Sequence, residues 1–380
     1  MSSAAVISTL PEIMSDLRKN LLAETKRIVI KIGSRVLVEA GNKGVNSAFI
    51  RKLAESVAIL RNAGKEIAIV SSGAVGAGMA RLGYSEKPEN IANKQACAAV
   101  GQIDLMHAYR SAFEKEKITV GQILLSAEDF RDRNRYKNLQ NILNSMLKHK
   151  VIPVINENDS VAVAEIKVGD NDKLSSDVAL FWNADLLLLF SDEDGLFDSN
   201  PKTNPNARLL NLVPDVTAEI LNLAKPGEAG SAVGTGGMHS KLEAVRAVTR
   251  SGCNAFLANG TKVLPHEVLF ENALGTLFLG NAKKLASRKK WLSFVSTPKG
   301  SITIDDGGVN AIRKKNASIL PVGIVGVSGR FDIKDLIEVK DLKGSRVARG
   351  ISRFGSDEMR EAVGVKNRGE AIHKNDLVVF

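Results

Sequence analysis

The sequence has 380 residues, of which 44% are hydrophobic and 25% charged. This composition supplies one large core and a smaller second one, and it excludes a mainly disordered chain. The net charge is +10, but residues 1–280 carry 32 Lys and Arg against 31 Asp and Glu, whereas residues 281–380 carry 20 against 11. Because local charge decides which part of a protein attracts an anion, this excess at the C-terminal end predicts two domains with different electrostatic roles.

The cysteines and the most apolar stretches predict the compartment. Cys97 and Cys253 are the two cysteines, and both lie in apolar surroundings, which suits buried thiols in a reducing compartment. Residues 1–26 lack the continuous apolar region of a secretory signal, and the apolar run at 178–190 is too short to span a bilayer. We therefore expect a cytoplasmic protein without a membrane segment, with residues 1–26 as an N-terminal extension.

Between residues 27 and 280, short β-branched or leucine-rich runs alternate with longer helical patterns. Strands are predicted at 27–32, 66–70, 150–155 and 186–190. A helix is predicted at 50–63, between the first two strands. Such alternation is typical of βα units around a mostly parallel sheet with helices on both faces. The predicted fold class is therefore α/β, an αβα sandwich that occupies residues 27–282.

The pattern changes after Gly280. Residues 281–291 are dense in Lys and Arg, and short strand-like runs separated by glycines follow to the C-terminus. Glycine-punctuated short runs favour a compact, mainly β module over another βα unit. The sequence therefore predicts a linker at 283–298 and a small, mainly β domain at 299–380.

Three glycine-rich segments lie where predicted strands end or helices begin: Lys31–Ser34, Ser71–Gly78 and Gly234–Lys241. Backbone N–H groups at a helix start attract anions, and Lys31 and Lys241 add the positive charge that phosphoryl transfer needs. Each segment alone is more often an ordinary turn. The three together favour a phosphate-handling site, while the absence of Walker A and Gly-x-Gly-x-x-Gly spacing disfavours P-loop and dinucleotide-binding folds.

Two polar clusters, Asn156–Asp159 and Lys167–Asp172, follow the predicted strand at 150–155. Their carboxylate and amide groups can hold an ammonium, coordinate a hard cation or orient lysines. Ordinary Asn/Asp turns are the alternative, since these side chains bond their own backbone. Together with the glycine-rich segments, the two clusters predict a site where a cationic amine meets an anionic phosphate.

These motifs resemble those of the glutamate 5-kinases, a group within the amino acid kinase family. The resemblance runs from about residue 26 onward and is carried by Val154–Asp159, Ala164–Asp172 and Gly234–Met238. These stretches separate the group from carbamate, acetylglutamate, aspartate and uridylate kinases. The resemblance implies ATP-dependent phosphorylation of the glutamate side-chain carboxylate, the first step of proline synthesis. It also implies Mg²⁺ with the ATP, a homo-oligomer, and free proline as feedback inhibitor.

The resemblance also implies roles for individual positions. The catalytic residues would be Lys31, Lys241 and Asp172, with the aspartate organising the two lysines. Glutamate would be bound by Ser72, Gly73, Asn156, Asp159, Asp170 and Asn171. ATP would be bound by Lys31, Ser191, Asp192, Thr235, Gly236, Gly237, Met238, His239, Ser240 and Lys241. Arg35, Ser191 and His239 differ from the commonest residues of the group, which affects only fine phosphate contacts.

Residues 299–380 resemble a PUA domain, a fold common in RNA-modifying enzymes. Its charge permits RNA binding, but few aromatic residues are interleaved with the basic ones, so a structural or regulatory role is favoured. An RNA-binding or RNA-modifying protein is one alternative, and it is disfavoured because the polar strand-end clusters lie in the near-neutral domain. A different kinase of the same fold is another, and it would differ at 156–172, where the acceptor is read.

Overall fold

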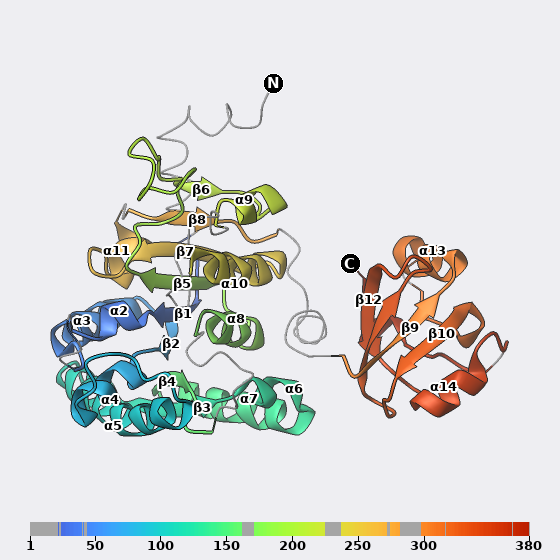
Figure 1. The fold of residues 1–380 in the computed structure, drawn as a ribbon, viewed down its shortest axis with the longest axis horizontal. Coiled ribbons are helices and arrows are strands. Elements are labelled where there is room, and N and C mark those ends of the chain that lie inside the picture. Colours follow the sequence, from blue (N-terminus) through green and yellow to red (C-terminus); the bar gives the residue numbers. More distant parts are fainter. Residues whose placement is uncertain are drawn as a thin grey trace. The chain divides into compact units, whose positions relative to one another are not determined.

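The computed structural model describes residues 22, 24–39, 41, 44–161, 171–224, 237–271, 274–281, 298–315, 317–366 and 368–379. Contacts divide the chain into two compact units, Met1–Lys284 and Leu285–Phe380, and each has its own sheet (Figure 1). The predicted extension 1–26 and linker 283–298 lie almost entirely outside the described residues. Within the described part, no helix is both long and apolar enough to cross a membrane.

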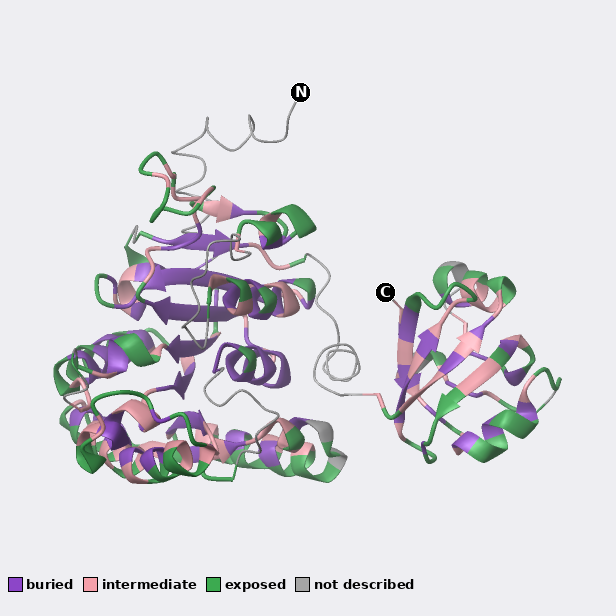
Figure 2. Cartoon of the chain, in the orientation of Figure 1, coloured by how far each residue is buried: buried purple, intermediate pink, exposed green. Residues whose placement is uncertain are grey.

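The first unit is built on an eight-stranded sheet in the order β3-β4-β2-β1-β5-β7-β8-β6. The strands are β1 (Arg27–Ile32), β2 (Glu66–Ser71), β3 (Val120–Leu125), β4 (Ile152–Glu157), β5 (Leu186–Ser191), β6 (Leu212–Val213), β7 (Asn254–Asn259) and β8 (Thr276–Phe278). Neighbouring strands are parallel except for β7 and β8. Every residue of β5 is buried (Figure 2), as expected for a parallel strand covered on both faces. The predicted parallel α/β sheet is confirmed.

Helices cover both faces of this sheet (Figure 1). The helices are α2 (Ser34–Leu37), α3 (Ser47–Asn62), α4 (Ala74–Leu82), α5 (Ile91–Lys115), α6 (Ala127–Arg131), α7 (Arg133–Lys148), α8 (Asn171–Phe181), α9 (Ala218–Asn222), α10 (Met238–Arg250) and α11 (Pro265–Phe270). On one side α3 packs against α5 and α11, and on the other α8 packs against α10. These two layers and the sheet between them form the predicted αβα sandwich.

Helices α4 and α5 approach each other more closely than ordinary side chains allow. A Cβ atom on Gly101 would lie 1.9 Å from the carbonyl oxygen of Ala74, and one on Gly78 would lie 1.8 Å from that of Cys97. Any residue other than glycine would therefore force the two helices apart. This contact leaves the pair little freedom to move independently.

The second unit is a five-stranded sheet in the order β10-β9-β11-β12-β13. The strands are β9 (Gly300–Ile304), β10 (Ile324–Gly329), β11 (Leu336–Lys340), β12 (Arg346–Ile351) and β13 (Leu377–Val379), and the helices are α13 (Asp306–Lys315) and α14 (Ser356–Ala362). Alternate strand residues such as Ile302, Ile304, Ile337 and Val339 are buried in one core with Phe331. A separate mainly β domain at the C-terminal end was predicted, and this sheet confirms it.

Candidate active site

The predicted site residues gather at the carboxyl edge of the large sheet. Strand β1 pairs with β2 on one side and with β5 on the other, so the chain order reverses direction at β1. Open α/β sheets bind ligands at such a point, beyond the carboxyl ends of the strands. Helices α8 and α10 begin at the same edge, and each brings a predicted catalytic residue to it in its first turn.

The centre of the site, which we call the charged centre, consists of Lys31, Asp172 and Lys241. The Lys31 Nζ atom lies 2.5 Å from Asp172 Oδ1, and the Lys241 Nζ atom lies 3.3 Å from Asp172 Oδ2. Ser240 donates a hydrogen bond of 3.0 Å to Asp172 Oδ2. The three charged residues are 5%, 1% and 7% exposed. The structure thus brings together residues from β1, α8 and α10 that the sequence places up to 210 positions apart.

Asp172 is held in its ionised form. Its burial alone would raise its pKa, but the ammonium groups of Lys31 and Lys241 and the hydrogen bonds from Lys31 and Ser240 outweigh this effect, so the pKa lies below its ordinary value. One carboxylate therefore stands between two lysines, which fixes both ammonium groups in nearly dry surroundings. Ammonium groups held in this way are already placed for an anionic phosphate, with little reorganisation required.

The backbone beside the Lys31 ammonium carries no side chain at Gly33. The Gly33 backbone N–H donates to the Phe190 carbonyl at 2.9 Å, and a Cβ atom on Gly33 would lie 3.2 Å from that oxygen and 3.8 Å from Lys31 Nζ. A side chain at this position would therefore occupy the space beside the ammonium. At α10 the N-cap is Gly237, which offers no side-chain cap, and uncapped N–H groups at a helix start attract anions.

The second part of the site, which we call the amide cluster, consists of Ser72, Asn156 and Asn171. The Asn171 Nδ2 atom lies 2.9 Å from Ser72 Oγ, 3.0 Å from Asn156 Oδ1 and 2.7 Å from the Ser71 carbonyl oxygen. All three side chains are buried. Gly73 follows with a φ of 93° and begins α4, a conformation that favours glycine.

Two buried oxygens beside this cluster have no hydrogen-bond partner among the described residues: Asn171 Oδ1 and Asp159 Oδ1. Burial raises the pKa of Asp159 to about 6, against the opposing charge of Lys87. Buried acceptors without a donor are costly and rare in folded proteins. Oxygens of this kind suit a bound ligand that brings N–H groups, such as an ammonium.

The end of β5 carries the predicted nucleotide residues Ser191 and Asp192. Ser191 Oγ accepts a hydrogen bond of 3.1 Å from the Glu193 N–H. Arg35 forms an exposed ion pair of 2.5 Å with Asp192, and although burial acts in the other direction, the hydrogen bond from Arg35 lowers the pKa of Asp192. Arg35 therefore pairs with a residue that is predicted to bind nucleotide.

The remaining predicted residues differ in placement. Met238 is partly buried and His239 is exposed in the first turn of α10, whereas Asp170, Thr235 and Gly236 lie outside the described residues. Among the described residues, no cluster of three or more His, Cys, Asp or Glu side chains could hold a metal ion. A Mg²⁺ ion that arrives with ATP fits such a site, because phosphate oxygens and water provide most of its ligands.

The sequence reasoning missed three residues that support the site from behind. Gln102 Oε1 accepts a hydrogen bond of 2.8 Å from Asn156. The hydroxyl groups of Tyr109 and Ser71 lie 3.1 Å apart. Asn259 donates a hydrogen bond of 3.1 Å to the Asp192 carbonyl oxygen. Gln102 and Tyr109 lie in the middle of α5, where no local pattern distinguishes a supporting residue from a packing one.

Comparisons with known proteins show which families the chain matches. The amino acid kinase family matches residues 26–259, and the PUA domain matches residues 300–374. A glutamate 5-kinase of Syntrophotalea carbinolica is 40% identical over 376 residues, which cover 96% of this chain and 100% of the relative. A glutamate 5-kinase of Geobacter sulfurreducens is 42% identical over 376 residues, with the same coverage.

Proposed function

The chain belongs to the glutamate 5-kinases of the amino acid kinase family, and from this premise we propose that it transfers the γ-phosphoryl group of ATP to the side-chain carboxylate of L-glutamate. The products are L-glutamyl 5-phosphate and ADP, and the reaction would open proline synthesis. The observation that carries the proposal is the buried charged centre, in which two lysines share Asp172 beside a cluster with unsatisfied acceptors.

The chemistry requires little covalent help from the protein. A carboxylate oxygen of glutamate forms the new bond to the γ-phosphorus, the bond to the β,γ-bridging oxygen breaks, and the electron pair leaves with ADP. The nucleophile is already ionised, so no general base is needed. What remains is alignment and positive charge around the transferring group, which Lys31 and Lys241 provide while Asp172 holds them in place. Mg²⁺ bound with the ATP would neutralise further phosphate charge.

The acceptor would be held by the other half of the site. Asp159 provides an ionised carboxylate for the α-ammonium of glutamate, and this role is supported by its Oδ1 atom, which has no hydrogen-bond partner within the described part of the chain. Asn171 and Ser72 provide polar contacts to the amino acid, with Asn156 fixed behind them by Gln102. We assign ATP to Ser191, Asp192 and the 235–241 segment, and glutamate to the 72–73, 156–159 and 170–171 segments.

The assignment of function is tested by ADP release from the purified protein with ATP and Mg²⁺. Glutamate is expected to support turnover far better than aspartate, acetylglutamate or carbamate. Hydroxylamine should trap the product as a hydroxamate, because acyl phosphates react with it. A preference for another of these acceptors would mean that the substrate is not glutamate, although the protein would still be a kinase.

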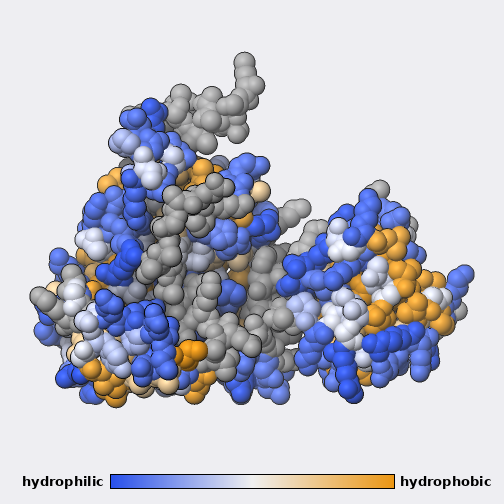
Figure 3. Space-filling view, viewed as in Figure 1, coloured by the Kyte–Doolittle hydropathy of each residue, from blue (hydrophilic) through white to orange (hydrophobic). Residues whose placement is uncertain are grey.

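We further propose that residues 27–282 form the kinase domain and residues 299–380 a structural or regulatory PUA domain, in a cytoplasmic homo-oligomer that free proline inhibits. The second unit exposes large hydrophobic side chains, including Leu320, Val325 and Ile333, and hydrophobic residues gather on the face shown in Figure 3. Apolar patches are typical of protein contacts, which supports assembly or regulation over RNA binding.

Deletion of residues from Lys299 onward tests this role. Glutamate-dependent ADP release is expected to persist, because every residue assigned to catalysis lies before Arg250, while proline inhibition or oligomeric state changes. Salt-dependent RNA retention by the full chain is the complementary measurement, since phosphate contacts weaken steeply with salt. Loss of catalysis in a well-folded truncation would contradict the division, and tight, salt-sensitive retention would favour the RNA role.

A further inference from the structure

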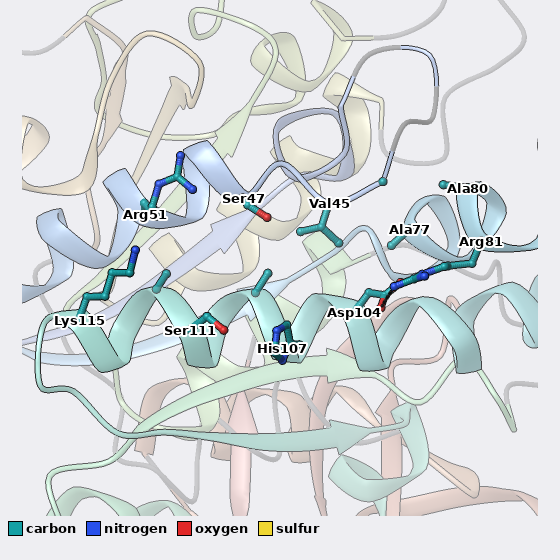
Figure 4. Close-up of a pocket in the computed structure, with 13 residues that line it drawn as sticks. Val45, Ser47, Arg51, Ala77, Ala80, Arg81, Asp104, His107, Ser111 and Lys115 are labelled. Carbon is teal, nitrogen blue, oxygen red and sulfur yellow. Dashed lines mark hydrogen bonds and ion pairs between the residues drawn. The ribbon is translucent and has the colours of Figure 1, made fainter.

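A cavity of about 590 Å³ lies between α3, α4 and α5 (Figure 4). None of the residues that line it is assigned above to ATP or glutamate. Its volume falls within the range of roughly 300–1,000 Å³ that small-molecule sites occupy. Its apolar floor is formed by Val45, Ala77, Ala80, Ala108 and Ala112.

The polar side chains of the cavity are arranged by charge. Arg51 and Lys115 lie at one end, and Arg81 and Asp104 at the other, as Figure 4 shows. Asp104 accepts hydrogen bonds of 2.7 and 3.1 Å from Arg81, so its negative charge is already paired. No ion pair is found for Arg51 or Lys115 among the described residues. The first end of the cavity therefore carries two cations that pair with no carboxylate in the described part of the chain.

The α5 side of the cavity is one face of the helix. Its polar residues Asp104, His107, Ser111 and Lys115 are spaced by three or four positions, which places them in a row. Ser111 and Ser47 add hydroxyl groups between the two charged ends (Figure 4). From this arrangement we propose that the cavity is a regulatory site for a small organic anion, whose phosphate or carboxylate group binds Arg51 and Lys115.

Helices α4 and α5, which line the cavity, also reach the acceptor half of the active site. Helix α5 carries Gln102, which holds Asn156, and Tyr109, whose hydroxyl lies beside that of Ser71. Helix α4 begins immediately after Ser72 and Gly73. Because α4 and α5 are in backbone contact at Gly78 and Gly101, a ligand that shifts them shifts the amide cluster too. An occupied cavity therefore changes the KM for glutamate more than the KM for ATP.

Binding is measured by calorimetry on the full chain, with a non-hydrolysable ATP analogue filling the nucleotide site. The probes are inorganic phosphate and succinate, which separate phosphorylated ligands from carboxylates. The Arg51→Gln/Lys115→Gln double variant is compared with Lys52→Gln/Arg110→Gln, which removes two exposed cations from the same helices outside the cavity. We expect saturable binding of one probe, weakened at least roughly ten-fold by the first pair only, since hydrogen bonds to charged groups are strong.

The kinetic arm rests on the proposed function, whereas the binding arm does not, so their failures are distinguishable. The bound probe should change the KM for glutamate in the parent protein and not in the Arg51→Gln/Lys115→Gln variant. Absence of saturable binding of both probes, or equal weakening in the two double variants, would overturn the site. Saturable binding that leaves the KM for glutamate unchanged would overturn its regulatory role.

Discussion

The two halves of the candidate active site satisfy their polar groups in opposite ways. In the charged centre, Lys31 and Lys241 both form ion pairs with Asp172, and Ser240 donates a hydrogen bond to the same carboxylate. In the acceptor half, Asn171 uses its amide nitrogen fully, yet its oxygen and an oxygen of Asp159 have no partner among the described residues. Both halves are buried, so the difference is one of pairing and not of exposure.

This contrast indicates how each half meets its ligand. The charged centre is complete by itself, and a phosphate joins lysines that are already fixed in position. In the acceptor half, two buried oxygens lack a donor among the described residues, and the proposed ammonium of glutamate would donate hydrogen bonds to them. Unsatisfied buried acceptors reduce the stability of the free protein, so the acceptor half exchanges stability for selectivity in glutamate binding.

The largest expected effect follows from removing the shared carboxylate by Asp172→Asn. Lys31 and Lys241 would then lose the buried carboxylate that they share, which should lower the free energy of unfolding by on the order of 3–5 kcal/mol. Denaturant titration measures this loss. Tripolyphosphate should raise the Tm of the variant more than that of the parent, because it replaces the missing negative charge. An equal rise in both proteins would mean that the lysines do not face the phosphate site.

The next effect concerns the two lysines. Lys31→Ala or Lys241→Ala should lower kcat by roughly 10²-fold or more, because each removes a fixed charge that acts on the transferring group. Lys173→Ala is the matched control, since Lys173 neighbours Asp172 on α8 but has an exposed side chain that pairs with the buried carboxylate of Asp177. A folded Lys31 or Lys241 variant with near-parental turnover would remove these residues from the mechanism.

The sequence predicts the charged centre better than its surroundings, for physical reasons. Lys31 and Lys241 stand next to glycines at a strand end and a helix start, which are local signals for an anion site. The predicted helix at 50–63 instead begins at Ser47, because Asn46 caps it by accepting from the Phe49 N–H at 3.0 Å. That cap is a local signal too, and it was overlooked.

The support behind the acceptor half could not be predicted from local pattern. Gln102 accepts a hydrogen bond from Asn156 across 54 positions, and it follows Gly101, where α4 and α5 are in backbone contact. Likewise, the sequence does not show that Asp159 Oδ1 lacks a hydrogen-bond partner among the described residues, since that depends on which side chains surround it. Residue types predict candidate roles, whereas packing decides which polar groups are satisfied.

A smaller effect is expected from Asp159→Asn, which keeps the shape of the side chain and removes its charge. If Asp159 holds the ammonium, the KM for glutamate should rise by roughly 10- to 100-fold, as for loss of a hydrogen bond between charged groups, while the KM for ATP stays nearly constant. The KM for glutarate, which lacks the amine, should rise by a smaller factor in this variant. Equal changes in both KM values would indicate that Asp159 is a structural turn residue. The control variant is Asp215→Asn, which removes a negative charge at an exposed position.

The smallest expected effect on the kinetic constants is the pH dependence of the acceptor half. The pKa of Asp159 is raised to about 6 by burial, so its carboxylate is lost as pH falls through that value, and the KM for glutamate at pH 5 should be roughly ten-fold above that at pH 8. Asp172 stays ionised over this range because its pKa is lowered. The Asp159→Asn variant should therefore show a flat profile.

The titration of Asp159 should also affect the stability of the protein, and here ionisation is unfavourable. A carboxyl group whose pKa is raised on folding binds a proton more readily in the folded state, so Asp159 costs stability as pH rises from about 4 to 6, by on the order of 3 kcal/mol. The difference in Tm between Asp159→Asn and the parent, without ligand, should therefore become more favourable to the variant across this window and stay constant above it. A difference that does not change with pH would show that Asp159 is already paired in the free protein, and the contrast between the two halves would fail.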